Sequence, residues 1–207
     1  MGRVGAYAAV VLAGGAARRM GGVDKPALPV GGRSMRDRVL SAIADASPRI
    51  LVGPADTPPP GVRVTRERPP GGGPVAATAA GLALLDAGTS VVALLAADLP
   101  LLTRDAVALL LRALADPAGG RVEADGACYV DADGRRQMLC GVWRVPALRG
   151  ALDRLAAERG GSLAGAPVRA LLAGLAVREV AWAGDGPPPW FDCDTDEDIR
   201  RAEEWAR

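Results

Sequence analysis

Stretches that are apolar at almost every position alternate along the chain with stretches in which apolar residues recur every third or fourth position. Two continuous apolar runs, residues 6–13 and 90–97, predict strands that are buried on both faces. Residues 35–46 and 146–158 carry apolar side chains at helical spacing, which predicts helices with one buried face. This alternation predicts an α/β fold in which helices cover both faces of a mainly parallel sheet.

Shorter segments complete the predicted fold. Segments 126–130 and 138–142 flank a turn and predict a pair of strands. Neither a linker nor an internal repeat divides residues 1–207, so the sequence predicts a single domain. We also expect strands at residues 50–52, 62–65 and 178–182, and helices at residues 75–86, 104–115, 167–173 and from near Asp196 onward.

The amino-acid composition excludes several classes of site and partner. The 207 residues include no histidine, which leaves carboxylates as the metal ligands to consider. Cys128, Cys140 and Cys193 are far apart in sequence and are expected to be small buried residues. A net charge of +1 implies no nucleic-acid partner. No run has transmembrane length and the start has no signal-peptide pattern, so we expect a cytoplasmic protein with no membrane partner.

The loop after the first apolar run is rich in groups that bind anions. Residues 10–26 read VVLAGGAARRMGGVDKP, and Lys25 is the only lysine in the chain. Glycines let backbone N–H groups approach a ligand closely, and successive free N–H groups bind anions. Arg18, Arg19 and Lys25 would attract phosphate oxygens. The spacing matches neither a Walker loop nor a dinucleotide fingerprint, and a glycine-rich turn with solvated arginines is the alternative interpretation.

Carboxylates follow the second apolar run and also gather near the C-terminus. Asp98 comes directly after residues 90–97, so it should lie at the C-terminal end of a central strand, where open α/β sheets bind ligands. Asp192 and Asp194 are two positions apart and would share one face of an extended segment. Asp194 or Thr195 is also suited to cap the last helix. The alternative is that these aspartates serve only turns and the helix cap.

The ordered pattern LAGG-x3-RMGG-x-DKP resembles the signature of the sugar-nucleotide-type nucleotidyltransferases, and most closely that of the molybdenum cofactor guanylyltransferases. Four further segments resemble the family in the expected order. Gly73–Ala77 resembles its Gly-Pro-Leu-Ala-Gly segment, and Asp98 begins a match to its Asp-x-Pro motif. Residues 137–143 resemble its Gln-Pro-Leu-x-Gly-Leu-Tyr segment for the second substrate, and residues 191–198 resemble its acidic ending. Within these segments Ala77 replaces a glycine of the family pattern, and Met138 and Asp196 each replace a proline.

The resemblance implies a Rossmann-like three-layer sandwich of the nucleotide-diphospho-sugar transferase type. It implies that Lys25, Arg19 and Asp98 take part in catalysis, and that Asp98 binds Mg²⁺ together with Asp192 or Asp194. By the same resemblance the nucleotide would contact Leu12, Ala13, Gly14, Gly15, Arg19, Lys25, Gly73, Pro74, Asp98 and Glu67, which is the nearest match to an acidic residue before the Gly-Pro pair.

The activity implied by the resemblance is Mg²⁺-dependent transfer of GMP from GTP to the phosphate of the molybdopterin cofactor, with release of pyrophosphate. Cytidylyl transfer to the same cofactor and guanylyl transfer to another phosphorylated small molecule remain open alternatives. An inactive relative that binds nucleotide and assists cofactor delivery is a different class, against which the presence of Lys25 and Asp98 argues. We expect a monomer or a weak homo-oligomer, and the sequence does not decide between Asp192 and Asp194 as metal ligand.

Overall fold

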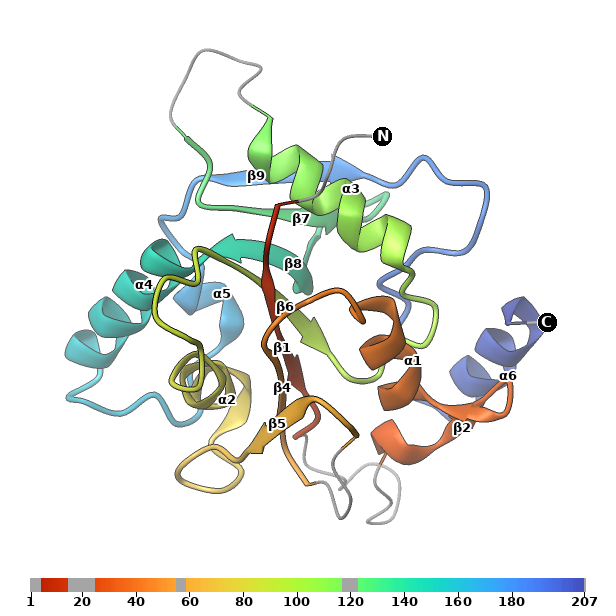
Figure 1. Ribbon diagram of the computed structural model, residues 1–207, viewed down its shortest axis with the longest axis horizontal. Helices are drawn as coiled ribbons and strands as arrows, with labels where there is room; N and C mark the ends of the chain where they lie inside the picture. Colours follow the sequence, from red (N-terminus) through yellow and green to blue (C-terminus); the bar gives the residue numbers. More distant parts are fainter. Residues whose placement is uncertain (1–4, 15–24, 55–58, 117–122, 207) are drawn as a thin grey trace.

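The chain forms a mainly parallel seven-stranded sheet with helices packed on its two faces (Figure 1). The computed structural model describes residues 5–14, 25–54, 59–116 and 123–206. The strands are β1 (Ala8–Leu12), β4 (Arg49–Val52), β5 (Val62–Thr65), β6 (Val91–Ala96), β7 (Gly126–Val130), β8 (Arg136–Arg144) and β9 (Val177–Ala181). Their order is β5-β4-β1-β6-β8-β7-β9, and only β8 is antiparallel to its neighbours.

The remaining elements connect these strands or follow the last of them. The helices are α1 (Met35–Ala42), α2 (Gly73–Leu82), α3 (Arg104–Ala115), α4 (Val145–Glu158), α5 (Val168–Leu171), α6 (Asp196–Trp205) and the short 3₁₀ helix η2 (Lys25–Ala27). A small separate hairpin joins β2 (Pro29–Val30) to β3 (Arg33–Ser34). The predicted fold class is confirmed, and so is the predicted pairing of β7 with β8.

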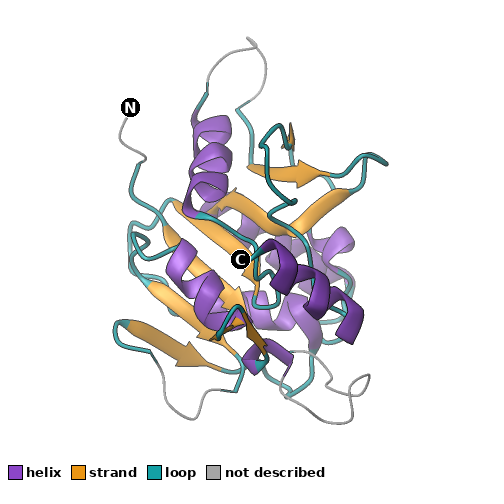
Figure 2. Ribbon diagram, turned by 90° about the vertical axis from the view of Figure 1, so that its right-hand side faces the viewer, coloured by secondary structure: helices purple, strands orange, loops and turns teal. Residues whose placement is uncertain are grey.

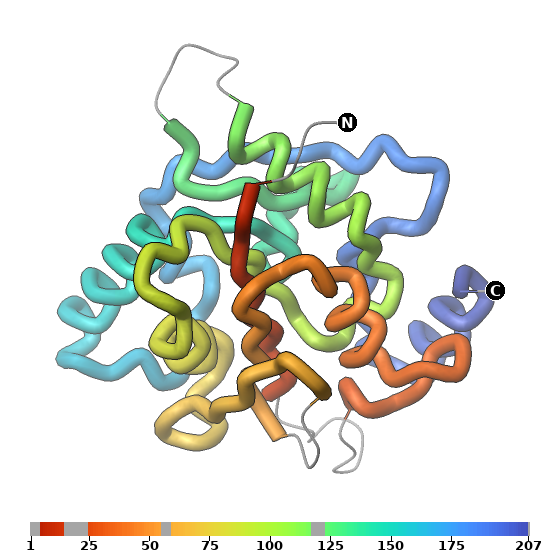
Figure 3. The backbone as a smooth tube through the Cα atoms, viewed as in Figure 1, coloured from red at the N-terminus to blue at the C-terminus, as the bar shows by residue number. Residues whose placement is uncertain are grey.

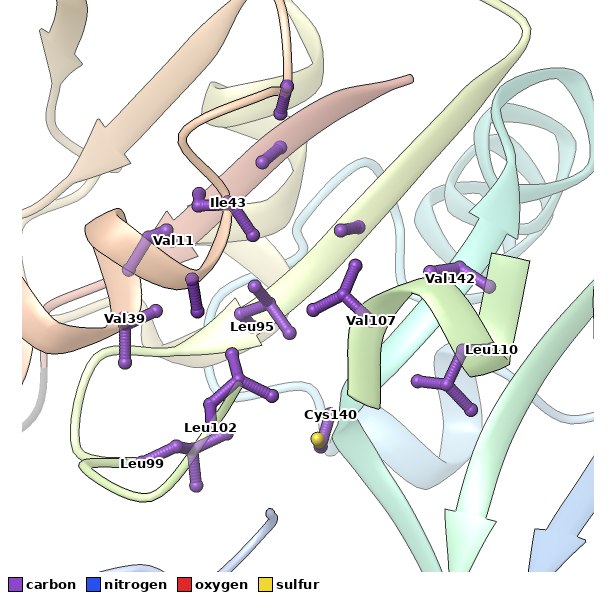
Figure 4. Close-up of a cluster of buried hydrophobic side chains, with 14 of the residues drawn as sticks. Val11, Val39, Ile43, Leu95, Leu99, Leu102, Val107, Leu110, Cys140 and Val142 are labelled. Atoms are coloured by element: carbon purple, nitrogen blue, oxygen red, sulfur yellow. The ribbon is translucent and has the colours of Figure 1, made fainter. Parts of the chain in front are cut away.

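Two apolar clusters fill the two sides of the sheet and make the fold three-layered. Val11 of β1 lies in one cluster with Val39 of α1 and Leu110 of α3 (Figure 4). Its neighbour Val10 lies in the other cluster with Leu148 of α4 and residues of α2 and α5. Successive strand residues point to opposite faces, so an unbroken apolar run is what a strand covered on both sides requires.

The C-terminal helix packs on a third, smaller cluster at the side of the sheet. Ala202 of α6 and Cys193 are buried there against Val30, Met35 and Leu101. The tube in Figure 3 shows the blue C-terminal segment next to the orange segment that follows the glycine loop. Figure 2 shows α6 on the side that faces the viewer, next to the C label, and Figure 1 shows it at the side of the molecule, beyond α1. The end of the chain is thereby brought back to the segment that contains Lys25.

Several element boundaries differ from the predicted ones by a few residues. The helix predicted to reach residue 46 ends at Ala42, and the chain continues in tighter turns in which Ala44 N bonds Ser41 O and Ala46 N bonds Ile43 O. α2 ends at Leu82 in the same manner, because the last turns of helices often tighten to i,i+3 hydrogen bonds. It begins at Gly73, where Pro74 suits the first turn.

The cysteines agree with the expectation from composition. Cys128, Cys140 and Cys193 are buried free thiols, as predicted. Burial raises the pKa of Cys128 to about 11, so this thiol stays protonated at neutral pH. Among the residues that the structure describes, no helix is long and apolar enough to cross a membrane.

Candidate active site

The strands β1, β4, β5 and β6 are parallel, so they end at one side of the sheet, which we call the carboxyl edge. The chain just beyond these strands stays tightly packed. Ala13 N donates to Val52 O at 2.8 Å, and Ala97 N donates to Leu12 O at 3.0 Å. A Cβ on Gly53 would lie 2.8 Å from the carbonyl carbon of Ala13, so only glycine fits after β4. The sequence analysis did not single out Gly53, although a glycine directly after a strand is a usable signal.

Lys25 joins two carboxylates that are far apart in sequence. Its Nζ lies 2.6 Å from Asp98 Oδ2 and 2.7 Å from Asp194 Oδ1. Asp98 lies two residues after the end of β6, and Asp194 lies 169 residues after Lys25. Burial lowers the pKa of Lys25, but the hydrogen bonds and charges of Asp194 and Asp98 outweigh it and raise the pKa overall. The lysine is therefore a firmly charged ammonium ion held between two carboxylates.

The C-terminal segment is fastened to the carboxyl edge by its backbone. Cys193 N donates to the carbonyl oxygen of Asp98 at 3.3 Å, and the Cys193 side chain is fully buried. The backbone N–H groups of Asp194 and Thr195 both donate to Asp198 Oδ2, at 3.1 Å and 2.8 Å. These bonds fix the backbone on either side of the Asp194 carboxylate, which is left to contact Lys25.

The cap of α6 separates the roles that the sequence left open for the C-terminal aspartates. Thr195 is the N-cap residue, and it forms a capping box with Asp198. Of the two predicted candidates, Thr195 rather than Asp194 caps the helix. The negative charges of this first turn also suit the helix N-terminus.

Asp192 lies near the same charges but in a different setting. Burial raises its pKa, and the negative charges of Asp194 and Asp98 add to that effect, while Lys25 opposes it. Asp192 therefore gives up its proton less readily than an ordinary aspartate. Within the part of the chain that the structure describes, no three acidic, thiol or imidazole groups are clustered closely enough to hold a metal ion by themselves.

Two carboxylates can nevertheless contribute to a Mg²⁺ site. Asp98 Oδ2 and Asp194 Oδ1 already contact one cation, the ammonium of Lys25, so both can face a single positive centre. Mg²⁺ commonly takes one or two carboxylates and completes its shell with water and substrate phosphate oxygens. The donor set of Asp98 and Asp194 fits that requirement.

The residues predicted to contact the nucleotide lie along the carboxyl edge where the structure describes them. Glu67, two residues beyond β5, accepts a hydrogen bond from Gly71 N at 3.0 Å. A Cβ placed on Gly14 would lie 3.5 Å from Glu67 Oε1, so Glu67 and the end of β1 are close neighbours. Leu12 and Ala13 are buried just before Gly14, and Gly73 and Pro74 open α2. Gly15 and Arg19 lie outside the described residues.

The segment expected to receive the second substrate begins at the carboxyl edge because β8 runs against its neighbours. Its Gln137 Nε2 donates to Asp131 Oδ2 at 3.1 Å, while Asp131 Oδ1 accepts from the backbone N–H groups of Asp133 and Arg135. This aspartate thus shapes the turn between β7 and β8, a role that sequence reasoning did not assign to it.

Comparison with known proteins places this chain in the nucleotidyltransferase class of enzymes. Residues 9–179 match the family described as "MobA-like NTP transferase domain". The chain belongs to this family, as the resemblance of its motifs implied.

Curated relatives cover nearly the whole chain. The molybdenum cofactor guanylyltransferase of Nitrobacter hamburgensis is 32% identical over 209 residues, which span 95% of this chain and 93% of the relative. That of Acidiphilium cryptum is 32% identical over 203 residues, which span 94% and 93%. Among solved structures, the molybdopterin-guanine dinucleotide biosynthesis protein A of Archaeoglobus fulgidus has a TM-score of 0.67 at 18% identity, over 96% of this chain and 97% of that one. At that identity the likeness shows a shared fold.

Proposed function

We propose that this protein transfers GMP from GTP to the phosphate of the molybdopterin cofactor and releases pyrophosphate. The observation that carries the proposal is the contact of Lys25 with both Asp98 and Asp194 at the carboxyl edge. That edge is where open α/β sheets bind ligands, and the lysine lies at the end of the glycine loop that resembles a triphosphate-binding loop. The names of the curated relatives, which span most of the chain, support guanylyl transfer to the molybdenum cofactor.

The proposed reaction is an in-line displacement at the α-phosphorus of GTP. A phosphate oxygen of the acceptor forms a new bond to that phosphorus, and the bond from the α-phosphorus to the bridging oxygen breaks. Pyrophosphate leaves with the bonding electron pair. An acceptor phosphate is already largely ionised at neutral pH, so no side chain is needed to remove a proton.

The main barrier is the repulsion between an anionic acceptor and an anionic triphosphate, so positioning and charge stabilisation dominate catalysis. Lys25 and Arg19 would neutralise triphosphate charge, and the backbone N–H groups of Gly14 and Gly15 would bind its oxygens. Asp98 and Asp194 would hold Mg²⁺, with Asp192 beside them. The metal ion would add positive charge and orient the phosphate oxygens.

Guanine would bind next to Glu67. Gly14, which follows Leu12 and Ala13, lies close to this carboxylate, and Gly73 and Pro74 would border the base or ribose. Glu67 Oε1 is engaged by Gly71 N, so its orientation is set by the loop before α2. Guanine presents adjacent N–H donors from which a carboxylate can accept hydrogen bonds, whereas cytosine does not. A site that forms such hydrogen bonds discriminates strongly between bases.

The proposal is tested by incubating the purified protein with molybdopterin cofactor, Mg²⁺ and each nucleoside triphosphate in turn. We expect pyrophosphate release and a guanine dinucleotide product, detected by mass, with GTP only. Lys25→Ala should reduce turnover about 10²-fold or more while the far-ultraviolet circular dichroism is kept. Arg63→Ala, which removes an exposed ion pair with Asp86, is the matched control and should leave turnover unchanged.

Two results would contradict the proposal. Product formation with CTP at a rate equal to that with GTP would reject guanine specificity. Unchanged turnover in Lys25→Ala would remove the lysine from the reaction and with it the main structural argument for the site.

A further inference from the structure

Lys25 lies where two carboxylates from distant segments share a cation. Its Nζ contacts Asp98 Oδ2 at 2.6 Å and Asp194 Oδ1 at 2.7 Å. The side chains of Lys25 and Asp98 are 19% and 24% exposed and that of Asp194 is 58% exposed, so water screens the Lys25–Asp98 pair less than an open surface pair. Without a cation between them, the two carboxylates would repel each other across a short distance.

We infer that Lys25 and the metal ion are alternative occupants of the space between Asp98 and Asp194. In the nucleotide-free protein the ammonium is the counter-ion of both carboxylates. When the nucleotide binds, its triphosphate draws the ammonium away and leaves the two carboxylates to the metal ion. This inference rests on the proposed function, and it adds to it a reason why metal should bind after or together with nucleotide.

The lysine is the partner that can move. Its ammonium ion is a compact charge with three donors on a flexible four-carbon stem, so it can change partners by rotating side-chain bonds. Lys25 opens η2, a single short turn in which no residue is buried. Moving this side chain therefore disrupts no part of the apolar core.

The carboxylates, in contrast, are held by features that do not depend on the cation. Asp98 lies two residues after the buried strand β6, and its carbonyl oxygen accepts from Cys193 N. The backbone of Asp194 is fixed through its hydrogen bond to Asp198 Oδ2. The site between the two carboxylates should thus persist when the ammonium leaves, ready to receive another cation.

The exchange makes metal and nucleotide affinities interdependent. Metal binding in the absence of nucleotide must displace an ammonium from both carboxylates, which weakens it. Nucleotide that removes the ammonium strengthens metal binding, and linkage requires that metal strengthen nucleotide binding by the same factor.

The test measures metal binding without nucleotide, so it does not depend on turnover. Mn²⁺, which is paramagnetic and takes the same oxygen ligands, is titrated into the full-length protein and followed by electron paramagnetic resonance. Lys25→Met keeps the length of the side chain but removes its charge. We expect it to bind Mn²⁺ about tenfold or more tightly than the unsubstituted protein, within the usual range of coupling between sites. Addition of a non-hydrolysable GTP analogue should tighten Mn²⁺ binding less in Lys25→Met than in the unsubstituted protein.

Two variants make the result interpretable. Arg63→Met breaks an ion pair between β5 and the residues after α2 and should leave Mn²⁺ affinity unchanged. Lys25→Arg keeps the positive charge and should bind Mn²⁺ as weakly as the unsubstituted protein. If Lys25→Met is too unstable to purify, Lys25→Gln, which is also uncharged, replaces it in the same titration.

The outcomes separate the inference from the proposed function. If Lys25→Met binds Mn²⁺ no more tightly than the unsubstituted protein, the lysine does not compete with metal and the inference is wrong, even when the GTP complex binds metal. If neither protein binds Mn²⁺ even with the GTP analogue present, the assignment of Asp98 and Asp194 as metal ligands fails, and the inference fails with it.

Discussion

Two polar clusters of this protein each tie distant segments together, but they balance charge differently. In one, Asp45 receives a hydrogen bond from the Tyr7 hydroxyl at 2.7 Å and two from Arg104, at 2.9 Å and 3.1 Å. One carboxylate there meets one guanidinium. In the other, the single ammonium of Lys25 serves both Asp98 and Asp194.

The pKa shifts report the same difference. The pKa of Asp45 is lowered, because the hydrogen bonds from Tyr7 and Arg104 outweigh the effect of burial. The pKa of Asp192, beside the lysine cluster, is raised by burial and by the neighbouring negative charges. In the first cluster, which we call the complete cluster, the charge of Asp45 is balanced by that of Arg104, and the cluster stabilises the fold. The second retains excess negative charge, which is typical of a site that binds a further cation.

The largest expected effect comes from neutralising one carboxylate of each cluster. Asp98→Asn should reduce the proposed Mg²⁺-dependent transfer by about 10²-fold or more, because one of the two charges proposed to hold the metal ion is lost. Its unfolding free energy should stay within about 1 kcal/mol of the unsubstituted protein, since one ammonium and one carboxylate remain paired.

Asp45→Asn is the matched substitution in the complete cluster, and it should show the opposite pattern. Turnover is kept, while urea denaturation should give a loss of about 1–2 kcal/mol because Arg104 and Tyr7 lose a charged acceptor. Turnover and denaturation measured on both variants check the comparison. Equal losses of activity in the two would show that the clusters do not differ in function.

Much of the fold could be predicted from local sequence patterns. An unbroken apolar run indicates a strand buried on both faces, and apolar residues at helical spacing indicate a helix with one buried face. The boundaries of α3 and β5 were predicted as the structure has them, since Thr103 caps the one and glycine precedes the other. Asp98 was recognisable because it comes directly after the apolar run that contains β6. The helix ends at Ala42 and Leu82 were missed, because tightened terminal turns leave no clear signal in composition.

The contacts between distant segments could not be read from the residues themselves. Nothing local indicates that Cys193 N bonds to the carbonyl oxygen of Asp98, or that Asp194 reaches Lys25. Those contacts arise because α6 packs on the third apolar cluster, whose members are scattered from Val30 to Ala202. Sequence spacing alone also could not decide whether Asp194 or Thr195 caps the last helix, and the structure has Thr195 as the N-cap residue.

A smaller effect is expected from the residue that orients Asp194. Asp198→Ala removes the acceptor for two backbone N–H groups and should cost about 1 kcal/mol of unfolding free energy, as loss of a helix cap does. Because the Asp194 carboxylate then becomes less fixed, the Mg²⁺ concentration needed for half-maximal turnover should rise several-fold. Rescue of both quantities in Asp198→Asn would show that the acceptor oxygen, rather than the charge, is what positions Asp194.

Asp196→Ala is the control for that measurement. Asp196 is an acidic residue of the same first turn, so its removal tests the general effect of charge near the helix N-terminus. We expect a loss of a few tenths of a kcal/mol and no change in Mg²⁺ dependence. If both variants change the Mg²⁺ dependence alike, the effect is one of overall charge and not of position.

The smallest effect concerns the pH dependence of the complete cluster. A carboxyl whose pKa is lower in the folded protein than in the unfolded chain contributes stability above the unfolded value, and loses it as pH falls through the folded value. The pKa of Asp45 is lowered from 3.8, so its contribution is fully present at neutral pH and disappears in acid below that value.

Tyr7→Phe removes one of the hydrogen bonds that lower the pKa of Asp45, and with it about 1 kcal/mol of stability at neutral pH. The difference in unfolding free energy between Tyr7→Phe and the unsubstituted protein, measured by urea denaturation, should therefore shrink as pH falls below 3.8. A difference that is the same at neutral and acid pH would mean that the Tyr7 hydroxyl stabilises the fold without help from the charge of Asp45.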